Sequence, residues 1–301
     1  MVINWEDRYL LGIERLDKQH KKLFTVARRI LNILADDSNN RSQKQQFACQ
    51  EGLKYLKIFL QEHFADEEAY MRSVDYKYYG AHKRLHDKMK DDLLPSIEKE
   101  LEETSYSKES IQKFIGVFLA ELISHVSTDD LAIVGRGPMH APPAKIDRNL
   151  NSFANIVSDI LTATFGDTFS AMLVDTNYAG GQVKQGIYYE YVYHYVTGEH
   201  MATFLVGIEE TLLFHTCAMI LGDESKQMNV LLYSLVAELS NIFFQRLVGK
   251  FIPATYEYKL ECSNFIPHEQ ILEQLARKIP DISTLFETDY GKFAICAYLS
   301  S

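Results

Sequence analysis

Residues 14–34 of the chain read ERLDKQHKKLFTVARRILNIL, and their apolar residues recur at intervals of three and four. These apolar positions are Leu16, Leu23, Phe24, Ala27, Ile30, Leu31 and Leu34. Because an α-helix has about 3.6 residues per turn, this spacing gathers the apolar side chains on one face. We therefore expect an amphipathic helix over about residues 14–37.

Three further stretches repeat the pattern, at about residues 42–67, 77–103 and 108–130. Short polar segments separate the stretches, around residues 36–40, 73–75 and 103–105. Four amphipathic helices with short connections predict an antiparallel four-helix bundle.

The chain changes character near residue 135. Residues 135–143 read GRGPMHAPP, with two glycines and three prolines in nine positions, which interrupts any helix and makes a semi-rigid linker. The 301 residues suit two domains better than one. We expect a first domain over residues 1–133, a linker over 134–146 and a second domain over 147–301.

The second part mixes helical and strand signals. We expect a helix at 148–164, strands at 169–176, 186–196 and 202–208, and a long helix at about 224–248. More strand signal and a short helix close the chain. The segment 187–196, IYYEYVYHYV, is rich in β-branched and aromatic residues and is interpreted as either a sheet edge that pairs with a second copy or a core strand. We expect an α/β domain built on a mostly antiparallel sheet with long helices.

The composition limits the classes of binding partner that we expect. The net charge is −10 and the pI is near 5.5, which disfavours nucleic acid and anionic membranes as partners. We see no secretory signal and no apolar run of membrane-spanning length. The four cysteines, at positions 49, 217, 262 and 296, form no C-x-x-C pair, so we expect buried, reduced thiols in a cytoplasmic protein.

Five of the ten histidines lie in the predicted bundle: His20, His63, His82, His86 and His125. His63 and Glu67 are four residues apart, as are His82 and His86, so each pair shares one helix face. A single helical histidine is usually solvated or a satisfied core residue. Five histidines and an acid spread over all four helices instead predict a metal site in the bundle core. Zinc is the competing metal, but these N/O donors, with no cysteine among them, outnumber the four that a tetrahedral zinc site needs.

These residues resemble the bacterial hemerythrins. The resemblance covers residues 1–132, and Trp5 also lies where bacterial members carry a tryptophan. The matching stretches are GIERLDKQHKKLF (12–24), HFADEE (63–68), HKRLH (82–86) and HVSTDD (125–130). The resemblance implies a non-haem di-iron site that binds O2.

In that reading, His82, His86 and His125 hold one iron, and His20 and His63 hold the other. The resemblance further implies that Glu67 and Asp130 bridge the irons, together with an oxo or hydroxo group. The iron with two histidines has the open position for O2. Regular helical spacing from His125 favours Asp129, whereas the family pattern selects Asp130, and a helix that loosens there permits it. Glu68 is interpreted as an outer or surface acid.

The long helix of the second part carries a polar stripe. Ser234, Glu238, Asn241 and Gln245 interrupt an otherwise apolar run at steps of four, three and four, which places them on one face. The plain interpretation of such a stripe is the solvated side of the helix.

The pattern Ser-x-x-x-Glu-x-x-Asn on this helix resembles the signature of the CheC/CheX/FliY phosphatases, and residues 148–301 look most like CheX. The resemblance implies dephosphorylation of a CheY-type chemotaxis response regulator and a homodimer. An amide suits this chemistry, because it positions water in line with the phosphoryl group while staying neutral. Asn241 is the candidate for that role, and Glu238 for docking on a lysine of the regulator. Ser234 and Gln245 are weaker candidates for contacts.

Together these features predict an oxygen- or redox-sensing di-iron protein whose CheX-like domain is a non-covalent aspartyl-phosphate phosphatase. One alternative is an oxygen-binding or storage protein with a catalytically silent docking or dimerisation domain. Another is an adaptor with a constitutive metal. The Glu238–Asn241 pair favours the phosphatase, because a docking surface alone does not need it.

Overall fold

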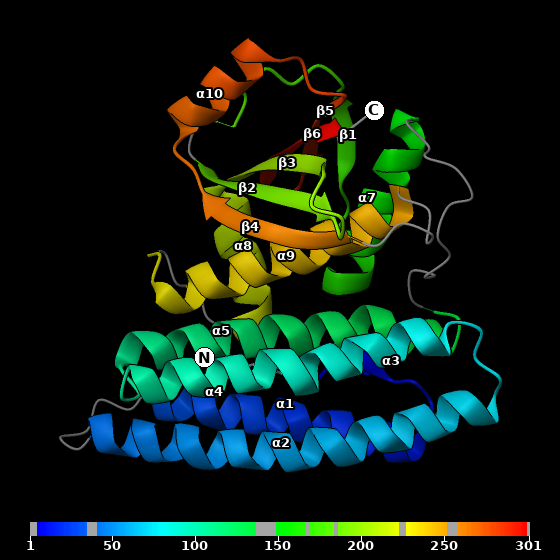
Figure 1. Cartoon of the computed structure of the whole chain (residues 1–301), viewed down its shortest axis with the longest axis vertical. Coiled ribbons are helices and arrows are strands. Elements are labelled where there is room, and N and C mark those ends of the chain that lie inside the picture. Colours follow the sequence, from blue (N-terminus) through cyan, green and yellow to red (C-terminus); the bar gives the residue numbers. More distant parts are fainter. Residues whose placement is uncertain are drawn as a thin grey trace. The chain divides into compact units, whose positions relative to one another are not determined.

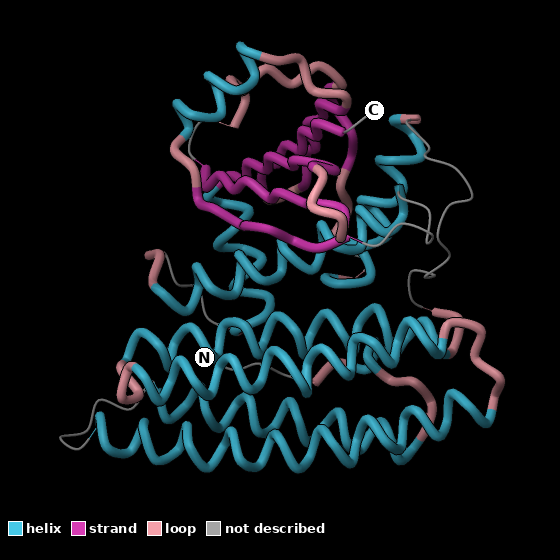
Figure 2. Tube along the Cα trace, in the orientation of Figure 1, coloured by secondary structure: helices cyan, strands magenta, loops and turns pink. Residues whose placement is uncertain are grey.

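The structure is a computed structural model, and it describes residues 5–34, 41–136, 149–166, 169–183, 186–222, 227–251 and 258–299. The chain divides into two compact units, one containing a helical bundle and the other a sheet (Figures 1 and 2). Most of the predicted linker, residues 137–146, lies outside the described ranges. Within those ranges, no helix combines the length and the apolar character that a membrane crossing requires.

The first unit contains the predicted bundle of four long helices (Figure 1). Its first two helices are α1 (Glu14–Leu34) and α2 (Arg41–Ser73). The third runs through α3 (Tyr79–Asp87), a π-helical segment (Lys88–Leu93) and α4 (Leu94–Glu103). The fourth runs through α5 (Lys108–Ser124), a π-helical segment (His125–Asp130) and α6 (Leu131–Ile133). A 3-10 turn, Asp7–Tyr9, precedes them.

Local contacts explain where these helices begin. The Asp17 carboxylate accepts the backbone N–H groups of Leu11 at 2.7 Å and Gly12 at 3.1 Å, which ties the N-terminal segment to the first turn of α1. The Ser107 side chain caps α5 by accepting the Ser110 N–H at 3.1 Å. The second helix continues to Ser73, six residues beyond the predicted end at residue 67.

The apolar face predicted for the first helix forms part of the bundle core. The buried apolar side chains of α1 are Leu16, Leu23, Phe24, Ala27, Ile30 and Leu31, while the side chain of Leu34 lies outside the described set. Helix α1 contacts α2 and α5, which contribute fully buried residues such as Leu56 and Leu119. Burying each large apolar side chain contributes about 1.5–3 kcal/mol, so this face holds α1 in the bundle.

The second unit contains a six-stranded sheet in the order β1-β5-β6-β3-β2-β4. Every paired neighbour is antiparallel. The strands are β1 (Met172–Asp175), β2 (Gly186–Tyr195), β3 (His200–Glu209), β4 (Tyr258–Phe265), β5 (Ile282–Thr288) and β6 (Gly291–Leu299). The helices of this part of the chain are α7 (Leu150–Phe165), α8 (Glu210–Leu221), α9 (Val230–Phe251) and α10 (His268–Arg277). The end of α8 and the first part of α9, within residues 219–238, are grouped with the first unit. The prediction of a mostly antiparallel sheet with long helices is confirmed.

Helices cover both faces of this sheet. On one face, the Phe244 ring of α9 lies 4.9 Å from that of Tyr191 and 5.2 Å from that of Phe204, and Phe153 of α7 packs on Phe286. On the other face, Ile271 of α10 belongs to the core cluster that contains Tyr188. The alternation of strand side chains therefore fills two cores.

The tyrosine-rich strand is core rather than edge. Strand β2 lies between β3 and β4, and the edges of the sheet are β1 and β4. The tyrosines at 188, 189, 191 and 193 are all buried. The interpretation of this strand as the edge that pairs with a second copy is therefore wrong, because both of its sides already pair within the chain.

Other boundaries differ from the predictions. Helix α8 was not predicted, because its sequence, ETLLFHTCAMIL, is apolar on almost every side and shows no polar interval. The described part of the long helix begins at Val230, after Gln227–Asn229, rather than at residue 224. The strand expected at 169–176 is limited to Met172–Asp175. The thiols of residues 49, 217 and 296 are free and buried, while the side chain of residue 262 lies outside the described set.

Candidate metal centre

The seven predicted metal ligands lie together inside the bundle. His20 comes from α1, His63 and Glu67 from α2, His82 and His86 from α3, and His125 and Asp130 from the fourth helix. The side chains of all seven are buried, and those of His20, Glu67, His82 and Asp130 have no exposed surface. They form two groups of converging donor atoms: Glu67, His82, His86 and His125; and His20, His63 and Asp130.

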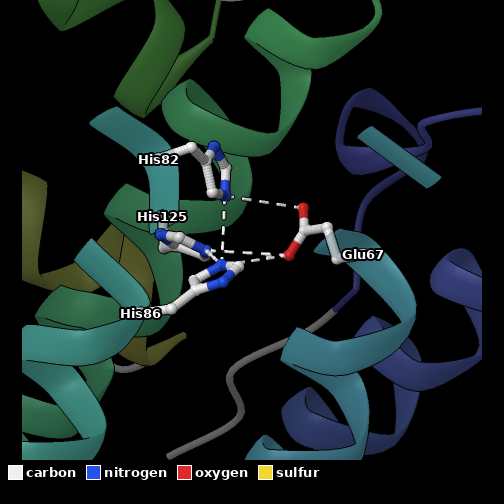
Figure 3. A group of neighbouring side chains, drawn as sticks. All are labelled: Glu67, His82, His86 and His125. Carbon is white, nitrogen blue, oxygen red and sulfur yellow. Dashed lines mark hydrogen bonds and ion pairs between the residues drawn. The ribbon is translucent and has the colours of Figure 1, made fainter. Parts of the chain in front are cut away.

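The first group contains three imidazoles and a carboxylate (Figure 3). The Nε2 atom of His86 lies 3.1 Å from that of His82 and 3.3 Å from that of His125. Glu67 faces these nitrogens from α2, with Oε2 3.3 Å from His86 Nε2 and Oε1 3.8 Å from His82 Nε2. The three rings and the carboxylate therefore surround one point.

The second group shares its carboxylates with the first. His20 Nε2 lies 3.2 Å from His63 Nε2 and 3.1 Å from Asp130 Oδ2. The other Asp130 oxygen, Oδ1, lies 3.0 Å from His125 Nε2 in the first group. Glu67 Oε2 is also 3.7 Å from His63 Nε2. Asp130 therefore has one oxygen toward each group, as a bridging carboxylate requires, and Glu67 lies between them.

These distances fit donors that share a cation. Atoms bound at about 2.1 Å to one metal lie about 3.0–3.4 Å apart. The far nitrogens of His63 and His86 face the acceptors Gln19 Oε1, at 3.0 Å, and Glu68 Oε1, at 3.3 Å. Each Nδ1 therefore carries the ring proton, and each Nε2 presents a lone pair to the centre. Lone pairs that converge beside buried carboxylates need positive charge between them. These residues therefore fit the two metal ions that the resemblance implies.

Burial also sets the protonation of the donors. It lowers the pKa of His20, and it lowers the pKa of His63 to about 3 and that of His125 well below the usual value. Burial alone would raise the pKa of Glu67, but the surrounding imidazoles, His86 foremost, hold it well below its usual range. Neutral imidazoles beside ionised carboxylates are the forms that bind metal ions.

A π-helical segment explains why Asp130 faces the centre. His125–Asp130 is wound as a π-helix, in which a turn takes more residues than in an α-helix, so residues five apart come to one side. Asp130 thereby joins His125 at the donor groups. Asp129 lies behind the ring, with Oδ2 3.7 Å from His125 Nδ1. Sequence spacing alone did not distinguish Asp129 from Asp130 as the bridging carboxylate, and the geometry favours Asp130.

We expect Asp130→Asn and Asp129→Asn to differ sharply in metal content. The first change removes the carboxylate between the groups, so bound metal should fall from about two ions per chain to one or fewer. The second alters an outer partner of His125 and should keep both ions, with an affinity about 10–100-fold weaker. Metal analysis after dialysis against a weak chelator measures both. The reverse ranking would contradict the bridging geometry.

The surroundings of the centre are aromatic. The Phe64 ring stacks on His86 with centroids 3.9 Å apart, and the Trp5 ring lies over His20 at 6.4 Å. Trp5 was singled out in the sequence, and the structure places it against the first ligand. Gln19 and its contact with His63 were missed, because nothing in the spacing of residues 19 and 63 shows that they meet.

The polar stripe of the second part lies on α9. Ser234, Glu238, Asn241 and Gln245 are all half-buried on this helix. The Gln245 Nε2 atom donates to Asn241 Oδ1 at 3.1 Å, and the Tyr258 hydroxyl donates to the backbone carbonyl of Gln245 at 3.2 Å. The side-chain bond from Gln245 orients the Asn241 amide, a role that spacing alone did not show.

The chain thus joins a helical bundle with a candidate metal centre to an antiparallel sheet domain. Residues 11–136 match the family described as Hemerythrin HHE cation binding domain, and this part of the chain is a hemerythrin-like domain. The bacteriohemerythrin of Clostridium acetobutylicum is 27% identical over 128 residues, which are 42% of this chain and 94% of that protein. A hemerythrin-like protein of Naegleria gruberi is 34% identical over 91 residues, 30% of this chain and 66% of that protein.

Solved structures similar to this chain include chemotaxis proteins. CheX from Vibrio vulnificus is 12% identical with a TM-score of 0.38, covering 50% of this chain and 98% of that one. The CheX–CheY–BeF3–Mg²⁺ complex from Borrelia burgdorferi contains a chain that is 11% identical with a TM-score of 0.39, covering 52% and 100%. At this level of similarity, the function of the sheet domain has to be argued from its own residues.

Proposed function

We propose that the hemerythrin-like domain holds two iron ions and binds O2. The observation that carries this proposal is the bridging position of Asp130, with one oxygen 3.1 Å from His20 Nε2 and the other 3.0 Å from His125 Nε2. Two iron ions would supply electrons and an open position for reversible O2 binding. Three imidazoles would hold one ion and two imidazoles the other.

The residues themselves favour two ions over one. Five imidazoles and two carboxylates exceed the four donors of a tetrahedral zinc site, and no cysteine among the described residues joins them. The donors are buried, and the rings of Trp5 and Phe64 lie against His20 and His86. Excluding bulk water from the site favours reversible binding, because it limits side reactions of the bound oxygen.

We further propose that the sheet domain, residues 147–301, dephosphorylates the aspartyl phosphate of a CheY-type response regulator. The support is the Glu238–Asn241 pair on α9, with the Asn241 amide held by Gln245. An oriented amide is suited to hold a water molecule in line with a phosphoryl group. Glu238 lies about one turn away on the same helix and suits a contact with a cation of the regulator. A homodimer and a cytoplasmic location belong to the same proposal.

Oxygen is expected to change the phosphatase rate. The proposed linker, residues 134–146, begins within a few residues of Asp130. A structural change at the metal centre would therefore occur close in sequence to the segment that connects the two domains. Regulation requires two states with different O2 affinity, and linkage then makes the effect reciprocal. A coupling of about 1–3 kcal/mol would change the rate about 5–150-fold between deoxy and O2-loaded protein.

The measurement compares rates in the deoxy, oxygen-loaded and oxidised forms, and repeats them with residues 137–146 replaced by a long Gly/Ser segment. Loss of the oxygen effect with the flexible segment supports the linker route. Equal rates in all three forms of the intact chain would reject regulation and favour an oxygen-binding protein with a separate phosphatase or docking domain.

A further inference from the structure

The far nitrogens of the metal-facing imidazoles have different outer partners in the two groups. In the two-histidine group, His63 Nδ1 donates to Gln19 Oε1 at 3.0 Å. The Gln19 Nε2 atom donates in turn to Asp66 Oδ2 at 2.8 Å, and Asp66 pairs with Arg15 at 2.6 Å. Because Asp66 takes the NH2 end of the amide, the carbonyl end of Gln19 faces His63. The partner of His63 is therefore a neutral oxygen.

In the three-histidine group, the outer partners are carboxylates. His86 Nδ1 lies 3.3 Å from Glu68 Oε1, and His125 Nδ1 lies 3.7 Å from Asp129 Oδ2. The Tyr79 hydroxyl donates to Glu68 Oε2 at 3.3 Å, which holds the carboxylate in place behind His86. Two of the three imidazoles in this group thus have an anionic group behind them.

The other histidine of the two-histidine group, His20, has no hydrogen bond at its far nitrogen. His20 Nδ1 is buried and has no hydrogen-bond partner among the described residues, and the Asp17 carboxylate acts on this ring only through space. Neither imidazole of the two-histidine group therefore has a hydrogen bond from its far nitrogen to a carboxylate, since Asp66 reaches His63 only through Gln19. The two groups share Glu67 and Asp130, so the shared bridges do not offset the asymmetry.

We propose that these outer partners make the two metal positions electronically unequal, with Glu68 and Asp129 favouring the ferric ion at the three-histidine position and Gln19 leaving the two-histidine position easier to reduce. This inference rests on the proposed di-iron site. A carboxylate behind an imidazole raises its basicity and stabilises the more positive ion, whereas a neutral amide does so less. Each reduction step adds one electron from an external reductant to one iron and breaks no bond.

The test exchanges the charges without changing the shape of the side chains. Glu68→Gln removes the anion behind His86 and keeps an acceptor oxygen. Gln19→Glu adds an anion behind His63, and it is made together with Asp66→Asn, so that an amide rather than a second carboxylate faces the new side chain. The iron-loaded full chain is reduced stepwise in a spectroelectrochemical cell, with iron content measured alongside. Glu62→Gln, an exposed acid of the same helix α2, is the matched control for loss of one charge.

In the unaltered chain we expect two resolved one-electron steps. Glu68→Gln should raise the lower reduction potential, and Gln19→Glu should lower the upper one. Each substitution should change the preference for the ferric over the ferrous ion about tenfold, which corresponds to a shift of about 59 mV. Combining the two charge changes should bring the steps together, Glu68→Asp should restore the original separation, and Glu62→Gln should leave both potentials in place.

The outcomes separate this inference from the di-iron proposal. Two irons per chain with potentials that do not move in either charge variant would overturn the inference and leave the di-iron site standing. A chain that binds a single metal ion would overturn the proposed site itself. If Glu68→Gln fails to hold iron, Gln19→Glu still decides, because an unchanged upper potential in that variant would refute the asymmetry.

Discussion

Replacing Glu67 by methionine should lower the stability of the metal-free chain and remove most of the iron from the loaded chain. Glu67 has no exposed surface, and the surrounding imidazoles, His86 foremost, hold its pKa well below the usual range. Because the ionised carboxylate is therefore favoured in the folded metal-free chain at neutral pH, its loss should destabilise the fold by about 1–3 kcal/mol. In the loaded chain, the same change removes a donor that lies between the two groups, so iron should fall below about one ion per chain.

Thermal or denaturant unfolding with and without iron, together with metal analysis, measures the loss of stability in each form. Glu62→Met is the control, because Glu62 is exposed on the same helix and its loss should change stability by less than about 0.5 kcal/mol in either form. A Glu67→Met variant that retains two irons would show that Glu67 is not a ligand. A metal-free variant as stable as the parent, or more stable, would show that the imidazoles do not stabilise the Glu67 carboxylate in the fold.

Asn241→Ala should abolish dephosphorylation of the phosphorylated regulator while iron content and fold stay unchanged. The amide is proposed to hold the attacking water, and loss of such positioning lowers a rate by about 100-fold or more. Glu238→Gln should lower kcat/KM by about 10–150-fold, since it removes a charge-assisted contact of about 1.5–3 kcal/mol. Gln245→Ala should have a smaller effect, because it only frees the Asn241 amide, whose oxygen it holds at 3.1 Å.

The assay follows the decay of phosphorylated regulator with each variant, and circular dichroism and iron content confirm an intact chain. Tyr233→Phe is the control on the same helix, because the Tyr233 side chain is 42% exposed and lies outside the polar stripe. Parent rates in the Asn241→Ala variant would mean that the stripe is only a polar helix face, and that the sheet domain docks without catalysis.

The sequence allowed most of the bundle to be predicted because helical periodicity is a local property. The apolar positions predicted for the first helix are buried from Leu16 to Leu31, and the separators at 73–75 and 103–105 mark helix ends. Helix α8 escaped because an element that is apolar on nearly all sides has no period to read. The tyrosine-rich segment was recognised as a strand, but its interior position depends on pairing with β4, about 70 residues away.

The candidate site could also be predicted only in part, because contacts between helices are not visible in local sequence patterns. The i, i+4 pairs placed four of the donors on helix faces, whereas the side on which Asp130 lies depends on the π-helical winding of His125–Asp130, which no residue pattern specified. The outer partners depend on contacts between helices. Gln19 meets His63 across 44 positions, and Glu68 meets His86 across 18. Resemblance supplied the ligand set, and only the packed bundle shows what lies behind each imidazole.

The most direct test of the account is the metal content of the purified full chain after anaerobic loading with Fe²⁺, measured with its absorption spectrum before and after O2 is admitted and removed. The donor groups around Glu67 and Asp130 predict about two irons per chain and a visible absorption change that reverses when O2 is withdrawn. A single tightly bound zinc ion per chain, with no response to O2, would contradict it.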